Sequence, residues 1–281
     1  MIKTVFIPAM LLLLSGWGLD TDESTLTLEE MTTGLHDAVS IYASSGGNLY
    51  IVEQDKNRFL KMNTAGERLD SLGRLGSGDY RFDQPVDIDA TNDLKIYVSD
   101  YQNRRIQAYD RRLQYLSTVQ LPRRAGATEF RPTALSVNRS GELFFFDEDR
   151  YRIYRIGGNG SYQDHFDARS IADIRELTGI AALDDLYLAD PNQQVVHRMT
   201  SNGTYLGFFE GGDNLKGISS HNRKIWVLSD NYVDVFSERG SLLHRFVLEK
   251  PGDVHDLAVF RNHIYFIGYD TLYSAKREPV N

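Results

Sequence analysis

The side chains best able to do chemistry in this chain are carboxylates and imidazoles that stand beside short, recurring apolar segments. When those segments are aligned, Asp87 and Asp256 occupy the same position, just before the core residue. Asp37, Lys216 and His255 occupy the position before that, and His36 stands one residue earlier again. Carboxylates together with imidazole could hold a calcium or zinc ion. A bound cation could in turn polarise an ester or lactone carbonyl.

A structural role for the same residues is the interpretation that we favour. An aspartate beside a strand can accept hydrogen bonds from backbone N–H groups, so Asp87 and Asp256 would serve the backbone while the histidines stay exposed. We then expect no metal and no other cofactor. The alternative is a calcium or zinc site formed by His36, Asp37, Asp87, His255 and Asp256.

Composition and motifs exclude several other kinds of site. The chain has no cysteine, so no disulfide, thiolate zinc site or cysteine nucleophile can form. No serine stands in a G-x-S-x-G elbow, and phosphate-loop and dinucleotide-binding patterns are absent. With 31 Lys and Arg against 39 Asp and Glu, the chain lacks the positive charge that nucleic acid requires. We interpret its one basic cluster as a solvated face: Arg104, Arg105, Arg111, Arg112, Arg123 and Arg124.

Four predicted loops mix aromatic, charged and amide side chains and are candidates for binding a partner. They are residues 79–82, 101–104, 148–151 and 231–232, and Tyr101 and Arg104 are the individual candidates among them. Tyrosine and arginine are enriched in protein interfaces. The loops therefore favour recognition of a protein, a small molecule or a glycan.

The elements that must position these residues recur through the whole chain. Six segments with the pattern of a buried strand begin 39 to 47 residues apart, at Leu49, Ile96, Leu143, Leu186, Ile225 and Ile264. A shorter apolar segment precedes each of them, and these align on Val39, Ile88, Leu135, Ile180, Ile218 and Leu257. A third and a fourth strand follow in most copies, often across a turn with Gly or Asn. This pattern predicts an all-β fold, a six-bladed β-propeller of four-stranded antiparallel blades.

Two further features concern how the blades are fastened. Five of the central strands are followed by an acid, which we interpret as a turn-closing acceptor for backbone N–H groups: Glu53, Asp100, Asp147, Asp190 and Asp230. The sixth copy ends at Ala275 without a fourth strand of its own. We expect an N-terminal strand, residues 24–28, to pair with this last blade and close the ring.

Residues 1–18 have the features of an export signal. Lys3 is followed by an apolar run and then by small residues, as in a secretory leader, and about fourteen apolar positions are too few for an ordinary membrane span. We expect residues 19–281 to form one propeller domain in the periplasm or outside the cell, with no membrane span after removal of the signal. An uncleaved anchor is the alternative.

The second repeat resembles the NHL-repeat β-propellers. The family pattern has a proline before the first strand, a hydrophobic-Tyr-Val strand that ends in Asp, an Asn three residues on, and then Arg-Ile. The residues that match are Pro85, Ile88, Asp89, Ile96, Tyr97, Val98, Asp100, Asn103, Arg105, Ile106 and Gln107. The fourth repeat keeps Asp190 but places Asn192 one residue early, and the last two repeats lack the Asn and the Arg.

The resemblance implies a six-bladed propeller, a fold that serves binding scaffolds, lactonases and an amidating lyase. The calcium-dependent lactonases combine a Glu, two Asn and an Asp, whereas none of the six aligned channel positions here is Glu or Asn. We therefore expect an exported, noncatalytic binding or scaffold module. A metal-dependent, lactonase-like hydrolase or lyase with its site at the central channel is the alternative, and a carbohydrate-binding surface protein is a third possibility.

Overall fold

A computed structural model of the chain describes residues 22–91, 94–122, 129–249 and 252–280. The export signal predicted at residues 1–18 and the basic residues Arg123 and Arg124 lie outside these ranges. Over these ranges the fold is almost entirely β, with one short helix, α1 (Ala168–Ala172), between the third and fourth blades. Within the described ranges, no helix is both long enough and apolar enough to cross a membrane.

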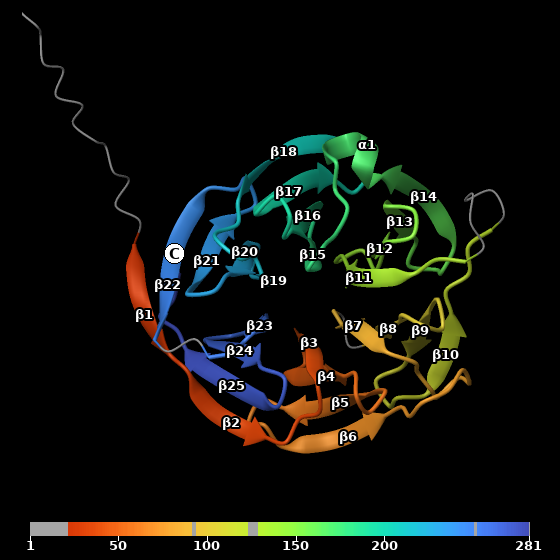
Figure 1. Ribbon diagram of the computed structural model, residues 1–281, viewed down its shortest axis with the longest axis horizontal. Coiled ribbons are helices and arrows are strands. Elements are labelled where there is room, and N and C mark those ends of the chain that lie inside the picture. The colour runs from red at the N-terminus through yellow and green to blue at the C-terminus, as the bar shows by residue number, and fades with distance from the viewer. Residues whose placement is uncertain (1–21, 92–93, 123–128, 250–251, 281) are drawn as a thin grey trace, which may run out of the picture.

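Six sheets stand around a central axis, which confirms the predicted six-bladed propeller (Figure 1). Blade one consists of β3 (Ala38–Ala43), β4 (Asn48–Glu53), β5 (Arg58–Asn63) and β6 (Arg68–Leu72), and blade two of β7 (Pro85–Asp89), β8 (Ile96–Asp100), β9 (Arg105–Tyr109) and β10 (Tyr115–Thr118). Blade three consists of β11 (Pro132–Val137), β12 (Leu143–Asp147), β13 (Arg152–Ile156) and β14 (Tyr162–Asp167), and blade four of β15 (Gly179–Ala182), β16 (Asp185–Asp190), β17 (Val195–Thr200) and β18 (Tyr205–Glu210). Blade five contains β19 (Gly217–His221), β20 (Lys224–Leu228), β21 (Tyr232–Ser237) and β22 (Leu242–Glu249), and blade six contains β23 (Asp256–Phe260), β24 (His263–Ile267) and β25 (Thr271–Lys276).

The second strand of each blade is covered on both sides, which explains its nearly continuous apolar sequence. Every residue of β8 and of β12 is buried. Between blades one and two, the rings of Phe59, Phe82 and Tyr109 lie 5.9 to 6.1 Å apart by their centres, in the tilted and edge-on arrangements that aromatic side chains prefer. The core therefore consists of apolar layers between adjacent blades.

An N-terminal strand closes the ring, as predicted, but a different segment does so. β2 (Glu29–Thr33) pairs antiparallel with β25 and forms the fourth strand of blade six. The predicted segment, residues 24–28, lies mostly in β1 (Glu23–Thr27), which pairs in parallel with β22 as a fifth strand of blade five. Leu26 explains this placement, because it is buried in one apolar cluster with Phe246 and Leu248 of β22.

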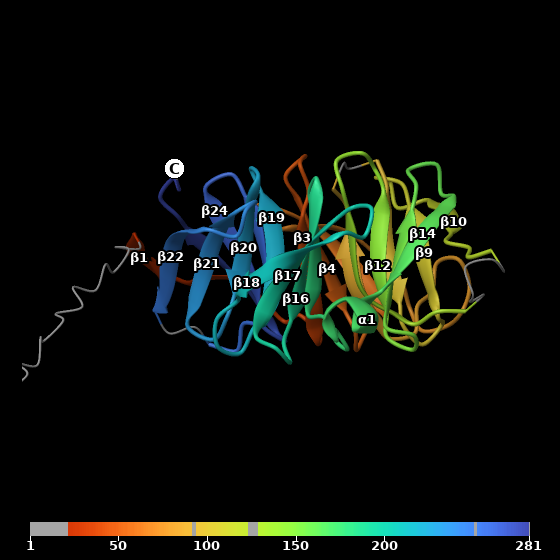
Figure 2. The same ribbon diagram turned by 90° about the horizontal axis from the view of Figure 1, so that it is seen from above.

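The disc has two faces with different loops. We call the front face the one at which the first strand of each blade begins; it faces the viewer in Figure 1 and forms the lower edge in Figure 2. It carries the loops between blades and the turns between second and third strands. The back face carries the other turns within the blades and the residues that follow β25.

Blade one departs from the predicted alignment by two residues. Ser40 takes the place that Asp87 has in blade two, and Ile41 rather than Val39 occupies the core column. Either alignment, with Val39 or with Ile41 in the core column, fits the sequence of β3, because its apolar residues alternate. As a result, Asp37 lies in the loop before β3, with a positive φ of 51°, and not at a channel position.

Candidate functional site

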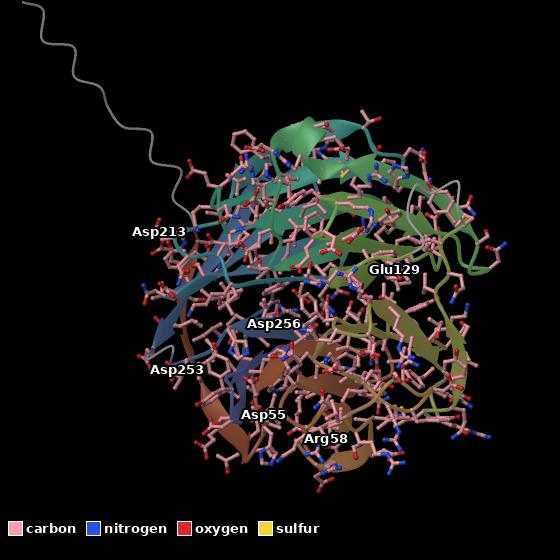
Figure 3. All side chains as sticks on the ribbon, turned by 45° about the vertical axis from the view of Figure 1, so that its right-hand side comes forward. Asp55, Arg58, Glu129, Asp213, Asp253 and Asp256 are labelled. Carbon is pink, nitrogen blue, oxygen red and sulfur yellow. The ribbon has the colours of Figure 1, made fainter. Side chains whose placement is uncertain are left out.

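The central channel is lined by first strands that are joined to one another through carboxylates. Asp87 on β7 accepts hydrogen bonds from the Ser40 hydroxyl at 2.8 Å and the Leu135 amide at 2.7 Å, so it connects blades one, two and three. Asp256 on β23 accepts one from the Ile41 amide at 2.9 Å and connects blade six to blade one. Figure 3 shows Asp256 toward the middle of the disc. The backbone role predicted for both acids is confirmed.

A third channel carboxylate, which sequence reasoning did not treat as a site residue, has the same role. Asp89 on β7 is buried and accepts hydrogen bonds from the amides of Thr91 at 2.8 Å and Val137 at 2.9 Å. Its position two residues after Asp87 was the available signal, because alternate residues of a strand point to the same side.

Glycines opposite these acids keep the channel narrow. Blades four and five have Gly179 and Gly217 where blade two has Asp87. A Cβ atom on Gly217 would lie 2.7 Å from a carboxylate oxygen of Asp256, so only glycine allows this approach. The cavity that remains along the channel is about 40 Å³, too small for an organic ligand.

Enclosure in the channel raises the pKa of all three aspartates. The pKa rises to about 7 for Asp87, about 8 for Asp256 and about 6 for Asp89, because removal from water disfavours the charged form. Hydrogen bonds from amides and hydroxyl groups lower each pKa in part, and the charge of Asp87 raises the pKa of Asp256 further. These carboxyl groups therefore exchange protons near neutral pH.

The five residues considered for a metal site do not come together. Only Asp87 and Asp256 lie in the channel wall. His36 is exposed and Asp37 is in the loop before β3, because the alignment of blade one is shifted, while His255 lies at the front end of β23. Among the described residues, no group of three or more His, Asp or Glu side chains is arranged to hold a metal ion.

Lys216 and His255 lie at the front mouth of the channel and connect neighbouring blades. The Lys216 ammonium group pairs with Asp230 at 2.9 Å and donates to the Val254 carbonyl at 3.1 Å. The Nε2 atom of His255 lies 2.6 Å from the Ala38 carbonyl oxygen, which calls for the proton on that nitrogen. Both side chains are partly exposed and could touch a ligand at this mouth.

A patch on the front face joins the loops of blades two and three. The Tyr101 hydroxyl donates to Glu148, and the Arg131 guanidinium lies 5.1 Å from the centre of the Tyr101 ring. Arg104 pairs with Asp149 at 3.0 Å, and Arg131 pairs with Glu148 at 3.5 Å. We call these five residues the Tyr101 patch. It unites two of the predicted loops, 101–104 and 148–151, and contains both individual candidates, Tyr101 and Arg104.

A cavity of about 520 Å³ opens beside the Tyr101 patch, between blades three and four. We call it the acidic cavity, because three of its lining residues are acids; the lining consists of Thr133, Phe146, Glu148, Asp149, Tyr151, Arg175, Glu176 and Leu177. Sequence reasoning missed residues 175–177, since the loop before β15 carries no motif. The usable signal was topological, because a loop that leads into one blade lies beside the turns of the blade before it.

The other two predicted loops do not join this surface. Residues 79–82 pack onto blade two, where the Tyr109 hydroxyl donates to the Asp79 carbonyl at 2.7 Å. The Tyr232 ring lies in blade five, 4.1 Å from the guanidinium carbon of Arg245. Their aromatic residues therefore serve packing within their own blades and, for Phe82, packing against Phe59 of blade one.

Comparisons with known proteins show the fold and nothing closer. No protein-family model matches the chain, and no curated protein matches it. Among solved structures, the chain is similar to a catalytically inactive virginiamycin B lyase from Staphylococcus aureus with quinupristin (TM-score 0.63, 14% identity, 90% of this chain and 88% of that one). It is also similar to a gluconolactonase from Xanthomonas campestris (0.66, 17%, 89% of each chain) and to the WD40 repeats of RRP9 (0.66, 10%, 89% and 97%). What these comparisons share with the NHL-repeat resemblance is the propeller architecture.

Proposed function

We propose that this protein is an exported, noncatalytic binding propeller that recognises a protein partner through its front face. The observation that carries the proposal is the Tyr101 patch with the acidic cavity beside it. Tyrosine, arginine and carboxylate side chains on loops of a rigid scaffold are the usual materials of a recognition surface. Here the surface spans three successive blades, two to four.

The acidic cavity favours a partner that inserts a basic side chain. Of its three acids, Glu148 and Asp149 already pair with Arg131 and Arg104, and the single lining base, Arg175, pairs with Asp173 at 3.1 Å. Glu176 accepts a hydrogen bond from the Asn192 amide at 3.3 Å but has no ion pair among the described residues, so a lysine or arginine of the partner could lay its apolar stem on the cavity wall and direct its charge to this carboxylate. The partner surface that fits best is therefore basic.

The hydrogen bonds in the channel suit a protein whose blades act as a rigid scaffold and whose front-face loops form the recognition surface. The channel aspartates accept hydrogen bonds from the neighbouring blades, so they fix the blades relative to one another. A rigid disc holds its loops in place before the partner arrives, and this reduces the entropy lost on binding. Export to the periplasm or the cell exterior is part of the proposal and rests on the leader-like residues 1–18.

Site-specific photo-crosslinking tests the proposal. A photoreactive amino acid at Gln102, exposed beside the patch, should capture a protein from the cell envelope or medium, whereas the same group at the exposed Asn202 of the back face should not. The captured protein, once purified, should bind at least tenfold more weakly to Glu176→Gln. Glu67→Gln makes the same change of charge on the back face and should leave binding unchanged. Equal capture from both faces, or equal binding to both variants, would refute the proposed surface.

A metal-dependent hydrolase or lyase is the second candidate function. The raised pKa values of Asp87 and Asp256 are the observation in its favour, since such carboxyl groups can act as acids and bases, whereas the channel cavity of about 40 Å³ leaves no room for an organic substrate beside them. Elemental analysis of protein purified without chelator separates the two functions. A stoichiometric divalent metal that is lost in Asp87→Ala or Asp256→Ala would favour the enzyme, whereas fully folded, metal-free protein would favour the binding module.

A further inference from the structure

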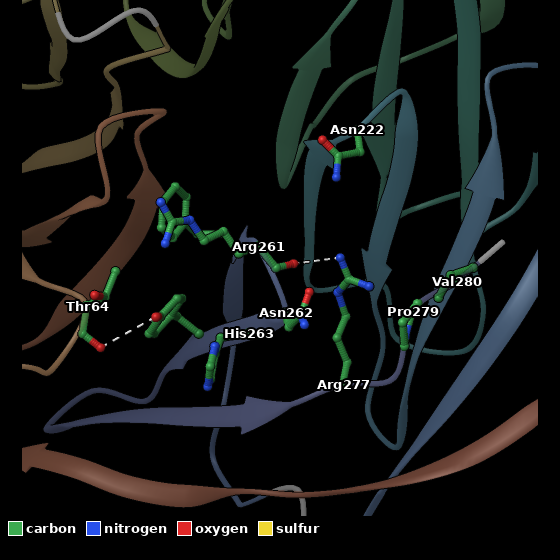
Figure 4. Close-up of a pocket in the computed structure, with 10 residues that line it drawn as sticks. Thr64, Asn222, Arg261, Asn262, His263, Arg277, Pro279 and Val280 are labelled. Atoms are coloured by element: carbon green, nitrogen blue, oxygen red, sulfur yellow. Dashed lines mark hydrogen bonds between the residues drawn. The ribbon is translucent and has the colours of Figure 1, made fainter.

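A second pocket, of about 680 Å³, lies on the back face (Figure 4). It is bounded by the first turns of blades five and six and by the chain that follows β25. We call it the tail pocket. The lining residues that matter below are Asn222, Phe260, Arg261, Asn262, His263 and Arg277.

The tail pocket is rich in nitrogen donors and positive charge. Two guanidinium groups, two side-chain amides and an imidazole line it, and none of its lining residues in the described part of the chain is Asp or Glu. The whole chain carries a net charge of −8, so the pocket runs against the overall composition. A concave surface of one sign concentrates ligands of the opposite sign.

Arg277 in the wall of this pocket is buried and incompletely paired. It is 8% exposed, and its two terminal nitrogens donate to the carbonyl oxygens of Arg261 at 2.7 Å and Glu278 at 3.2 Å. Its Nε atom has no hydrogen-bond partner among the described residues. Carbonyl oxygens do not neutralise a full positive charge, and burial accordingly lowers the pKa of Arg277.

Among the described neighbours of Arg277, Lys224 adds a second positive charge, whereas Trp226 and, at neutral pH, His221 do not. The Trp226 ring lies 4.7 Å from the Arg277 guanidinium carbon, and its indole N–H has no partner among the described residues. Burial and the charge of Arg277 lower the pKa of His221 to about 4 and also lower that of Lys224. The ammonium group of Lys224 donates to the Val280 carbonyl, again a neutral acceptor.

We propose that the tail pocket binds a small organic anion, a carboxylate or a phosphate, through Arg261 and Arg277. A guanidinium group presents parallel N–H donors that match two oxygens of either anion. The Phe260 ring offers an apolar wall for the carbon skeleton, and the amides of Asn222 and Asn262 can bond its polar substituents. The anion would contribute the negative charge that this part of the back face lacks.

Fluorescence titration of the full chain tests the proposal. The readout is Trp226, because the Arg277 guanidinium lies over its ring, and Trp17→Phe removes the other tryptophan. Inorganic phosphate and acetate are titrated separately, with the ionic strength held constant by chloride. We expect a saturable change with at least one of them, and the one that saturates identifies the anion class. A change that is equal with chloride, or that never saturates, would overturn the proposal.

Three variants show whether the signal comes from the tail pocket. Arg261→Asn should weaken binding at least tenfold; Arg261 is exposed, and its φ of 53° is one that asparagine tolerates, so the fold should persist. Arg277→Gln should abolish binding of the anion. If this variant fails to fold, the result for Arg261→Asn alone still shows whether the anion binds in the tail pocket. Arg223→Asn is the matched control, since it removes an equal charge from a back-face turn at φ 60° but outside the pocket, where Arg223 pairs with Glu238. Equal weakening by this control would overturn the proposal.

Residue 281 lies outside the described residues. A last variant therefore shows whether the tail pocket binds an anion from solution or the carboxylate at the end of this chain. A chain extended beyond residue 281 by a glycine- and serine-rich segment, which carries the terminal carboxylate away from the pocket, should bind the same anion with an unchanged Kd. Binding that occurs only in this extended chain would assign the tail pocket to the chain terminus and overturn the proposal.

Discussion

Buried acids at the ends of the second strands fasten blades one, two and three to the loops that lead into them. Glu53, Asp100 and Asp147 accept hydrogen bonds from amides of these loops at 3.0, 2.8 and 2.9 Å, whereas Asp190 bonds within its own turn. All four acids thus accept hydrogen bonds from backbone N–H groups, as predicted, but among the described residues only Asp147 and Asp190 close the turn that follows them, which was the role predicted for all four. Asp230, grouped with them from the sequence, follows one residue later and pairs with Lys216 at the surface.

Asp100→Ala should destabilise the protein by about 3 kcal/mol or more, since it would leave a partly buried guanidinium and a backbone amide without their acceptor. Asp100 is fully buried and accepts hydrogen bonds from the Asp83 amide, from Asn103 and from Arg105. Urea unfolding measures the loss. Asp230→Ala is the matched control: its side chain is 46% exposed, so we expect less than about 1 kcal/mol. Equal losses in the two variants would contradict the fastening role.

The candidate site could be predicted from sequence only in its parts. Tyr101 and Arg104 were recognisable as loop residues of the right types for binding. Their pairing with Glu148 and Asp149 could not be predicted. It depends on two turns, one repeat apart in the sequence, that lie at the same height on adjacent blades. Glu176 gave no signal, since its loop lacks both a motif and a counterpart in the other repeats.

At the scale of elements, the N-terminal arm formed by β1 and β2 fastens the ring at two blades. β2 covers the edge of β25 in blade six, and β1 continues onto the edge of β22 in blade five. The six second strands were predictable, because burial on both sides favours an almost continuous apolar sequence. The partners of β1 and β2 were not, since both segments are short, polar and extended, and only the position of Leu26 in the core distinguishes them.

Nested deletions separate the two strands of this arm. Removing residues 1–28 takes away β1 and should lower Tm moderately, because the buried Leu26 is lost. Removing residues 1–33 also takes away β2, leaves the edge of β25 unpaired, and should lower Tm much further and promote association of the disc. Thermal unfolding and gel filtration provide the measurements. Identical Tm values for the two deletions would show that β2 does not hold the ring closed.

At the scale of the whole molecule, the raised pKa values of the channel aspartates make stability depend on pH. The folded pKa values of Asp87 and Asp256, about 7 and about 8, exceed the usual 3.8. The folded state therefore binds more protons than the unfolded state, and stability falls as the pH rises through these values. Below about pH 6.5 the lowered pKa values of His165 and His221 act in the opposite direction. The useful window is thus pH 6.5 to 9.

Raising the pH from 6.5 to 9 should lower the free energy of unfolding by about 3 kcal/mol, or Tm by about 5 °C. The cause is the cost of charging Asp87 and Asp256 inside the channel. Asp256→Asn has no proton to lose and should reduce this pH dependence, whichever way it changes stability itself. A constant Tm across the window in the parent protein would show that these carboxyl groups remain charged throughout.

The N-terminal arm also determines how late in synthesis the ring of blades can close. Within the described part of the chain, β1 pairs with residues 245–249 and β2 pairs with residues 271–274. A chain that emerges from a ribosome or a translocation pore starting at its N-terminus can assemble blades one to four as they appear. Meanwhile β1 must wait until residue 249 is released and β2 until Ser274 is released, and closure over so long a separation is slow. The earliest strands to be made are thus the last to be paired, and the propeller becomes a ring in one late step.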